Sequence, residues 1–285
     1  MDHSLISSPA SSLTDSEPVI QFSDVHIGFT DGDILRGVSF TAQSRETLVL
    51  LGETGTGKTL TLKMAAGLLC PDRGQIEVLG NRVSSMSEHD LLAFRRKVGF
   101  VFQEGALFDS LTVGDNVAYR LTEDGLSQAE IAPRVEEVLR FVELEHTMDL
   151  LPSELSGGMR RRVSIARAII SGPDLILYDS PTGGLDPITS TTIIELVMKQ
   201  RDVSHTTSLL VTHRLQDAFA LATHRFDTTT GGMKPIPPDP GQTHKGPGID
   251  PGTKFLMLNE GSIVFHGTTE ELVHSKDPWI ENYLA

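Results

Sequence analysis

A glycine-rich segment that ends in lysine and threonine has the residue types needed to hold a phosphate chain. It reads Gly52-Glu53-Thr54-Gly55-Thr56-Gly57-Lys58-Thr59 and fits the spacing G-x-x-x-x-G-K-[S/T]. Glycines let the backbone curl so that its N–H groups point at phosphate, and a following helix presents its positive end to the same place. We predict that Lys58 binds the β- and γ-phosphates of a nucleotide and that the Thr59 hydroxyl binds Mg²⁺. Leu60 stands where many such loops place a second hydroxyl, so one phosphate contact is expected to be missing.

A carboxylate that could hold the same metal lies far along the chain. Asp179 ends the apolar run Leu175-Ile176-Leu177-Tyr178, which predicts a buried strand. Carboxylate and hydroxyl oxygens are ligands that Mg²⁺ prefers, so Asp179 and Thr59 are candidate metal ligands. A phosphate loop with such an acid is compatible with kinases, GTPases and motors, and other residues must decide between these classes.

A second anion site is predicted upstream of the Asp179 strand. The segment Leu155-Ser156-Gly157-Gly158-Met159 opens a helix that continues through Arg160-Arg161-Arg162 to Ala168. Ser156 and the N–H groups of the two glycines could bind an anion there. The segment resembles the signature sequence of ATP-binding cassette (ABC) ATPases, with Met159 in place of the usual glutamine. The resemblance implies ATP as the nucleotide and a dimer of two copies, in which each signature reaches the γ-phosphate held by the partner's phosphate loop. The three arginines are expected to form a solvated basic helix face rather than to contact lipid or nucleic acid.

The resemblance implies roles for three further polar residues. Gln103, after the predicted strand 98–102, would sense the γ-phosphate and Mg²⁺ and lie against a membrane partner. Asp186, in the sequence Gly-Leu-Asp-Pro, would couple the two sites of the dimer. His213, after the predicted strand 207–212, would bond the γ-phosphate and hold the attacking water in place.

An aromatic ring for stacking on adenine is expected between the first two strands. Phe29 stands at that place. Phe22 is the alternative, although its position in an alternating strand pattern favours the interior.

Ser180 departs from the pattern at the residue that matters most for hydrolysis. The resembling ATPases carry a glutamate directly after the metal-binding aspartate, and that glutamate polarises the attacking water. Serine cannot accept a proton near neutral pH, and a positioned general base contributes roughly 10²- to 10⁴-fold to the rate. Three explanations are open: Glu104 acts through a water, a different ATPase subunit supplies an intact site, or slow hydrolysis suffices.

The predicted elements place these residues in an α/β fold. Short apolar runs predict three strands between Val19 and Leu51, residues 111–166 are predicted to be rich in helices, and a hairpin with a short helix is expected from Phe255 to Ser275. The resemblance implies an ABC-type P-loop NTPase with an antiparallel β subdomain, a RecA-like parallel-sheet core and an α-helical subdomain, covering residues 19–275. Residues 1–18 and 276–285 are expected to be tails, the first disordered, and residues 226–254 an irregular surface insertion.

Composition limits the classes of partner. The net charge of −14 argues against general affinity for nucleic acid or an anionic membrane surface. A single cysteine excludes an internal disulfide and a cysteine-based metal site. The sequence has no apolar run long enough to span a membrane and no pattern of a secretory signal, so a cytoplasmic location, peripheral on the inner face of the cell membrane, is expected.

A local sequence pattern indicates a branch of the ABC family. The run from Phe102 to Val113, with Asp115-Asn116-Val117-Ala118-Tyr119 after it, resembles the ATPase subunits of Mla/Mce-type lipid transport systems. That resemblance implies two copies of this chain beneath an integral-membrane lipid permease, which works with a protein bearing the mammalian-cell-entry domain. Leu107 and Phe108 would then either receive the permease or belong to ordinary core packing, and the sequence leaves both open.

Two classes of function follow from these residues. The first is an ATPase subunit that energises phospholipid transport between membranes. The second is a regulatory cassette that closes on ATP with little turnover. Translation-factor cassettes carry two tandem sets of motifs, and the single set in this chain argues against that class.

Overall fold

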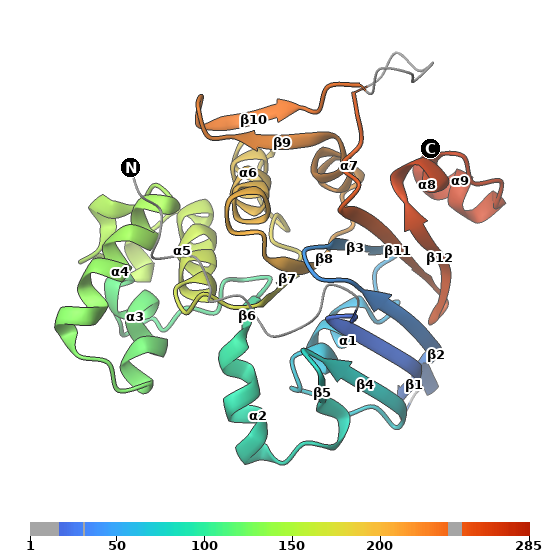
Figure 1. Ribbon diagram of the computed structural model, residues 1–285, viewed down its shortest axis with the longest axis horizontal. Coiled ribbons are helices and arrows are strands. Elements are labelled where there is room, and N and C mark those ends of the chain that lie inside the picture. Colours follow the sequence, from blue (N-terminus) through green and yellow to red (C-terminus); the bar gives the residue numbers. More distant parts are fainter. Residues whose placement is uncertain (1–16, 31, 239–246) are drawn as a thin grey trace.

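The computed structural model describes residues 17–30, 32–238 and 247–285. Within these residues the strands form a four-stranded antiparallel sheet, a six-stranded mixed sheet and a separate two-stranded hairpin. Helices flank the six-stranded sheet, and a group of three helices stands to one side of it (Figure 1). The predicted N-terminal tail lies almost entirely outside the described residues.

The antiparallel sheet is built from the N-terminal part of the chain, as expected. Its order is β2-β1-β4-β5, and its strands are β1 (Ile20–Phe29), β2 (Gly32–Ala42), β4 (Arg73–Val78) and β5 (Asn81–Arg82). Apolar residues alternate along β1, so one face is buried while the other carries polar side chains. Phe22 pairs with Phe40 across β1 and β2, and both side chains lie in the core.

The six-stranded sheet brings the polar candidates to one edge. Its order is β12-β11-β3-β8-β7-β6, with every neighbouring pair parallel except β11 and β12. The strands are β3 (Thr47–Gly52), β6 (Val98–Val101), β7 (Leu175–Asp179), β8 (Thr207–Val211), β11 (Thr253–Asn259) and β12 (Ser262–Thr268). Strands β3, β7 and β8 are buried along their whole length, as expected for parallel strands covered on both faces. Their carboxyl ends therefore share one edge, which is where parallel sheets bind ligands.

The helices fall into two groups. Those around the six-stranded sheet are α1 (Lys58–Ala65), α2 (Glu88–Phe94), α6 (Pro187–Ser204), α7 (Leu215–Thr223), α8 (Thr269–Val273) and α9 (Pro278–Leu284). The helical group comprises α3 (Val113–Glu123), α4 (Gln128–Phe141) and α5 (Gly157–Ile169). Short 3₁₀ turns are η1 (Val83–Ser85), η2 (Arg95–Lys97), η3 (Glu145–Thr147) and η4 (Pro152–Glu154). Helix α4 begins with the capping box expected from the sequence, in which Ser127 N donates to Glu130 Oε2 at 2.9 Å.

In the described residues the structure differs from two predictions about irregular segments, and residues 239–246 of the first segment lie outside the described part of the chain. The expected insertion at 226–254 contains the hairpin of β9 (His224–Asp227) and β10 (Gly232–Pro235), and β11 begins inside its last residues. The hairpin lies beside α6 and α7, away from the antiparallel sheet (Figure 1). Its turn formers misled the prediction because a tight turn and a loop use the same residues. The expected C-terminal tail contains α9, where Asp277 caps the helix and Ile280 is buried in the core.

Candidate nucleotide-binding site

The phosphate loop connects the end of β3 to the start of α1. Lys58 Nζ donates to Gly52 O at 2.8 Å and to Glu53 O at 2.5 Å, so the side chain folds back across the loop. Burial lowers the pKa of the Lys58 ammonium, and the nearby carboxylates of Asp179 and Glu53 partly offset this. A cation held in such a low-dielectric place interacts strongly with an anion brought to it. The geometry supports the predicted role of Lys58 in holding phosphate.

The first glycine of the loop cannot be replaced without strain. Gly52 has φ of 146°, and a Cβ atom on it would lie 2.4 Å from Leu258 O on the neighbouring strand. The other predicted loop residues follow the expected path: Thr56 Oγ1 donates to Glu53 O at 2.9 Å, and Leu60 turns partly into the core.

The two predicted metal ligands are in contact. Thr59 Oγ1 donates to Asp179 Oδ1 across 3.1 Å. Two neighbouring oxygens on a Mg²⁺ octahedron with bonds of about 2.1 Å lie about 3 Å apart, so this spacing fits adjacent ligands of one ion. Burial raises the pKa of Asp179, while the Thr59 hydrogen bond and the Lys63 and Lys58 charges oppose the shift.

Ser180 occupies a strained backbone position at the end of β7. Its φ is 46°, in the left-handed region that residues other than glycine rarely adopt. Its N–H donates to Val211 O at 2.9 Å, and its carbonyl accepts from Gly183 N at 2.9 Å. Strain of this kind costs of order 1–3 kcal/mol and clusters at functional sites. The backbone at Ser180 is thus held in a fixed conformation by contacts on both sides, and the side chain that it carries is not a base.

A buried arginine that the sequence reasoning misassigned ties the site together. Arg161 is 5% exposed, and it donates to Phe102 O at 2.9 Å and to Gly183 O at 3.3 Å. It thus links the residue before Gln103 to the loop that follows Ser180. The prediction of a solvated basic face is wrong for this residue, because a charge run does not reveal which side of the helix meets another loop.

Gln103 and His213 each lie two residues after a strand of the six-stranded sheet. The side-chain nitrogen of Gln103 approaches Gly183, at 3.7 Å from the position a Cβ there would take. His213 is separated from the end of β8 by Thr212, and it is exposed. Both are therefore placed at the edge where Asp179 lies.

A second carboxylate near Ser180 had no signal in the sequence analysis. Asp217 on α7 is buried, accepts a hydrogen bond from the Thr182 hydroxyl and pairs with Arg214 Nε at 3.4 Å. Burial raises the pKa of Asp217, and the Thr182 bond and the charges of Arg214 and His213 oppose the shift. Glu104, the alternative base from the sequence, is exposed and close enough to Arg161 to interact with its charge.

The signature segment and the loop that contains Asp186, predicted to couple the two sites of a dimer, meet within one chain. Ser156 caps α5 by accepting from Met159 N at 3.2 Å, and Asp186 caps α6 by accepting from Ile188 N and Thr189 N at 3.0 Å. A Cβ on Gly158 would lie 2.4 Å from Thr189 Cγ2, so a larger residue would require the Thr189 side chain to move. Leu155, at the start of the signature, is buried. The N–H groups of Gly157 and Gly158 open α5, as an anion site requires.

The two candidate stacking rings differ in exposure. Phe29 is 56% exposed at the end of β1, whereas Phe22 is 2% exposed and stacks on Phe40 with ring centroids 4.6 Å apart. A ring that is already buried between strands has no free face for a ligand. We expect Phe29→Ala to weaken ATP binding by roughly 5- to 150-fold, the effect of losing about 1–3 kcal/mol of stacking on a base. Fluorescence titration with a labelled ATP analogue measures this, and an unchanged Kd would contradict the assignment.

The C-terminal helix also reaches the phosphate loop. The Tyr283 hydroxyl accepts from Gly52 N at 3.2 Å and lies 3.3 Å from Gly52 O, and its ring stacks on Trp279 at 5.3 Å. Burial raises the pKa of this phenol. The sequence offered one signal for α9, the Asp-Pro start of a helix at Asp277, but nothing in it indicated what Tyr283 contacts.

Comparison with known proteins agrees with this arrangement. A family model described as "ABC transporter" matches residues 35–183. The chain is 36% identical over 281 residues to the chloroplastic protein TRIGALACTOSYLDIACYLGLYCEROL 3 of Arabidopsis thaliana, covering 95% of this chain and 74% of the relative. It is 31% identical to the intermembrane phospholipid transport system ATP-binding protein MlaF of Escherichia coli K12, covering 90% of this chain and 86% of the relative. The sulfate/thiosulfate import ATP-binding protein CysA of Caulobacter vibrioides is 39% identical over 217 residues, covering 75% of this chain and 62% of that protein.

A solved structure shares the fold. The ATP-binding cassette MJ0796, in a dimeric post-hydrolysis state bound to ADP and Pi, superposes with a TM-score of 0.72 at 26% identity, covering 87% of this chain and 98% of that one. Within residues 17–30, 32–238 and 247–285, no helix is both long and apolar enough to cross a bilayer. These matches agree with the phosphate loop and the signature segment. The chain therefore belongs to the ABC transporter family and is an ABC ATP-binding subunit.

Proposed function

We propose that this chain energises phospholipid transport between membranes, as a homodimer bound to the cytoplasmic face of a lipid permease of the Mla/Mce type. Relatives that it matches over at least 90% of its length include MlaF of Escherichia coli, named for phospholipid transport, and the chloroplastic Arabidopsis protein. CysA, named for sulfate import, aligns over a shorter part of the chain. The permease would act with a mammalian-cell-entry-domain protein, which this chain would contact only indirectly.

An aromatic groove beside the Gln103 loop is the observation that carries the proposal of a membrane partner. Phe108 is 42% exposed and Tyr119 is 40% exposed, with ring centroids 4.6 Å apart. They line a cavity of about 300 Å³ whose other walls include Phe100 and Phe102. Exposed aromatic clusters of this kind are typical of binding surfaces. Phe108 would receive an apolar segment of the permease, while Leu107 packs partly against the core.

An arginine side chain that binds backbone carbonyls connects the groove to the loop at the nucleotide site. Arg167 donates to Gly105 O at 2.9 Å and to Ala106 O at 2.8 Å, and its guanidinium lies 5.8 Å from the Phe108 ring centroid. This loop begins at Gln103, which directly follows Phe102, and the Phe102 carbonyl accepts a hydrogen bond from Arg161. A partner seated on Phe108 would therefore press on the loop that senses the γ-phosphate.

In the proposed reaction this chain binds ATP and closes, and water activation limits the rate. Lys58 and the loop N–H groups hold the phosphates, Thr59 and Asp179 would hold Mg²⁺ with Gln103 nearby, and the partner copy's signature residues complete the site. Bound Mg²⁺ would neutralise charge that develops on the phosphates. His213 would orient the attacking water toward the γ-phosphate. Ser180 takes no proton, so positioning and electrostatic stabilisation supply the residual rate.

We expect Phe108→Glu to abolish co-purification with the permease while leaving ATP affinity unchanged, because a charge placed in an apolar contact must be desolvated. The matched control is Leu92→Glu on α2, which is 61% exposed and lies outside the groove lining. Membranes carrying both proteins are solubilised and the complex is captured through a tag on the permease. Capture of the Phe108→Glu chain at the level of the control would contradict this docking site.

The lipid itself is tested by transport. The purified complex, reconstituted in vesicles, is given fluorescent phospholipid or radiolabelled sulfate with and without Mg²⁺ and ATP. ATP-dependent movement of phospholipid and not sulfate supports the proposal. Movement of sulfate alone would show that the chain serves an importer of the CysA kind.

A regulatory cassette with little turnover is the second candidate, favoured by Ser180. Both candidates predict an ATP-bound dimer of the isolated chain, but the regulatory cassette also predicts that no permease co-purifies. The capture experiment above separates the two, because it succeeds only for a transporter subunit.

A further inference from the structure

The hydroxyl of Tyr283 on α9 bonds the first residue of the phosphate loop twice. It accepts from Gly52 N at 3.2 Å and donates to Gly52 O across 3.3 Å. A phenolic hydroxyl is both a donor and an acceptor, so one group can serve both backbone atoms. A residue far from the loop in sequence is thus part of what holds the loop's first peptide groups.

Gly52 O also accepts from the lysine that is predicted to hold phosphate. Lys58 Nζ donates to it at 2.8 Å and to Glu53 O at 2.5 Å. An ammonium has three donors, so the loop's own backbone occupies two of them and leaves one. One donor each for the β- and γ-phosphates requires two. At least one of these carbonyls must therefore give up Lys58 when a nucleotide binds.

Each of the two carbonyls has a second donor. Tyr283 supplies it to Gly52 O, and the Thr56 hydroxyl supplies it to Glu53 O at 2.9 Å. A carbonyl oxygen has two lone pairs, so it can accept from both donors at once. Gly52 is a buried residue and Glu53 an exposed one, so the need for a protein donor is greater at Gly52 O. Tyr283 therefore keeps that carbonyl bonded when Lys58 turns to phosphate.

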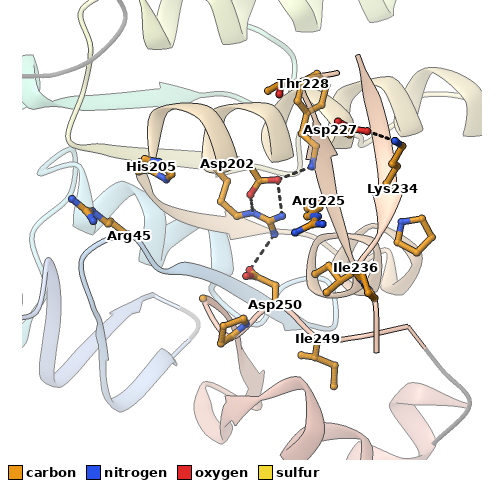
Figure 2. A pocket seen from close by; sticks show the side chains of 16 residues that line it. Arg45, Asp202, His205, Arg225, Asp227, Thr228, Lys234, Ile236, Ile249 and Asp250 are labelled. Carbon is orange, nitrogen blue, oxygen red and sulfur yellow. Dashed lines mark hydrogen bonds and ion pairs between the residues drawn. The ribbon is translucent and has the colours of Figure 1, made fainter. Parts of the chain in front are cut away.

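The chain that carries Tyr283 is held to the sheet from the start of β11. Just before this strand, Asp250 accepts a hydrogen bond from Arg201 at 3.2 Å (Figure 2). Strand β11 then pairs with β3 in parallel, in a register that places Leu258 opposite Gly52. The C-terminal segment therefore starts from a fixed position beside the strand that ends in the phosphate loop.

Packing of α9 holds the tyrosine ring in place. Asp277 Oδ1 caps the helix by accepting from Trp279 N at 2.8 Å and from Ile280 N at 3.2 Å, and Ile280 is buried in the core. The Tyr283 ring stacks on Trp279 with an angle of 26° between the ring planes. Burial raises the pKa of the phenol, so the hydroxyl keeps the proton that it donates. A side chain locked by packing can position a neighbouring group, as a functional site requires.

We propose that Tyr283 is a positioning residue of the nucleotide site, whose hydroxyl holds the Gly52 backbone and keeps Gly52 O bonded while Lys58 binds the phosphates. Tyr283 acts through Gly52 and Lys58 and not on the nucleotide directly. The proposal rests on ATP binding at the phosphate loop, and it is independent of which molecule is transported. It gives α9, which lies outside the family match at residues 35–183, a part in the site.

The test is calorimetric titration of the full chain with Mg²⁺ and a non-hydrolysable ATP analogue. Tyr283→Phe removes the hydroxyl and keeps the ring that stacks on Trp279. We expect the Kd to rise by about 2- to 12-fold, the effect of losing one net hydrogen bond, with an unchanged number of sites per chain. Tyr178→Phe is the matched control, because it removes the hydroxyl of a tyrosine buried in the core on β7, and its Kd should equal that of wild type.

Two comparisons separate positioning from a general effect on the fold. AMP lacks the phosphates that draw Lys58 away from Gly52 O, so its affinity, measured by competition, should be equal in wild type and Tyr283→Phe. Trp279→Phe changes the packing of α9 and keeps the Tyr283 hydroxyl, so it should bind the ATP analogue more tightly than Tyr283→Phe does.

Three results would overturn the proposal: an unchanged Kd of Tyr283→Phe for the ATP analogue, an equal loss of affinity for AMP and the analogue, or an equal loss in Trp279→Phe. A lower number of sites in Tyr283→Phe at an unchanged Kd would also overturn it, because that result reports unfolded chains. Failure of the wild-type chain to bind the analogue is a separate outcome, which would contradict ATP binding at the phosphate loop itself.

Discussion

Ser180→Glu is expected to raise the steady-state ATPase rate by about 10²- to 10⁴-fold, the usual contribution of a positioned general base. The backbone at this position already has φ of 46°, held by hydrogen bonds to Val211 and from Gly183. A glutamate side chain at position 180 would therefore extend from a backbone whose conformation these hydrogen bonds already fix. The Mg²⁺ ligands and Lys58 are unchanged, so the substitution should act on kcat with little effect on ATP affinity. Phosphate release at saturating ATP measures kcat, and titration with a labelled analogue measures affinity.

Ser180→Gln is the matched control, because glutamine has nearly the same shape and cannot accept the proton. Its rate should stay near that of wild type. An unchanged rate in Ser180→Glu with retained ATP binding would contradict the account of water activation. In that case the base lies elsewhere, and Glu104→Gln, which replaces an exposed carboxylate, would abolish the wild-type rate.

Asp179→Asn is expected to lower hydrolysis by at least about 100-fold while raising the thermal stability of the protein in the absence of nucleotide. The loss of activity follows because an amide is a poor ligand for Mg²⁺. The gain in stability follows because burial raises the pKa of Asp179, so the folded chain holds an ionised carboxylate at a cost that the amide does not carry.

The sign of the pH dependence follows from the same shift. Folding raises the pKa of Asp179 above its unfolded value, so the folded state binds the proton more tightly. Wild-type stability is therefore penalised above the folded pKa and recovers as pH falls through that value. The stability advantage of Asp179→Asn should be present at pH 8 and shrink near pH 4, as measured by thermal unfolding.

Asp174→Asn is the control for this pair of effects. Burial also raises the pKa of Asp174, which stands just before β7, whereas Asp179 ends that strand. The control should gain stability at pH 8 and keep its ATPase rate. A loss of stability in Asp179→Asn would show that the hydrogen bond from Thr59 outweighs the cost of the buried charge.

Local patterns in the sequence predicted the elements that carry the phosphate site. The glycines and Lys58 lie within a few residues of one another, and the apolar run before Asp179 predicts a buried strand without knowledge of its neighbours. Parallel strands then bring Thr59 and Asp179 together, which the structure realises as a contact of 3.1 Å. The spacing of residues in the sequence was sufficient to predict this site because each functional group is positioned by its own strand or turn.

Contacts between distant segments could not be predicted in this way. Arg161 lies in a run of three arginines, and only the packing of α5 against the loops at Phe102 and Gly183 distinguishes it from its neighbours. Tyr283 lies 231 residues from Gly52 in sequence and meets it through the position of α9. The hairpin at 224–235 was taken for a loop because its turn residues outweighed its short strands.

We expect this site to bind ATP and close as a dimer, and the residue at position 180 to limit hydrolysis. The most direct test follows the dimer of the wild-type chain by light scattering after mixing with Mg²⁺ and ATP. The account predicts a dimer that forms without any hydrolysis-blocking substitution and persists for many times longer than the dimer of Ser180→Glu. Failure of the wild-type chain to dimerise with ATP, or equal lifetimes of the two dimers, would contradict it.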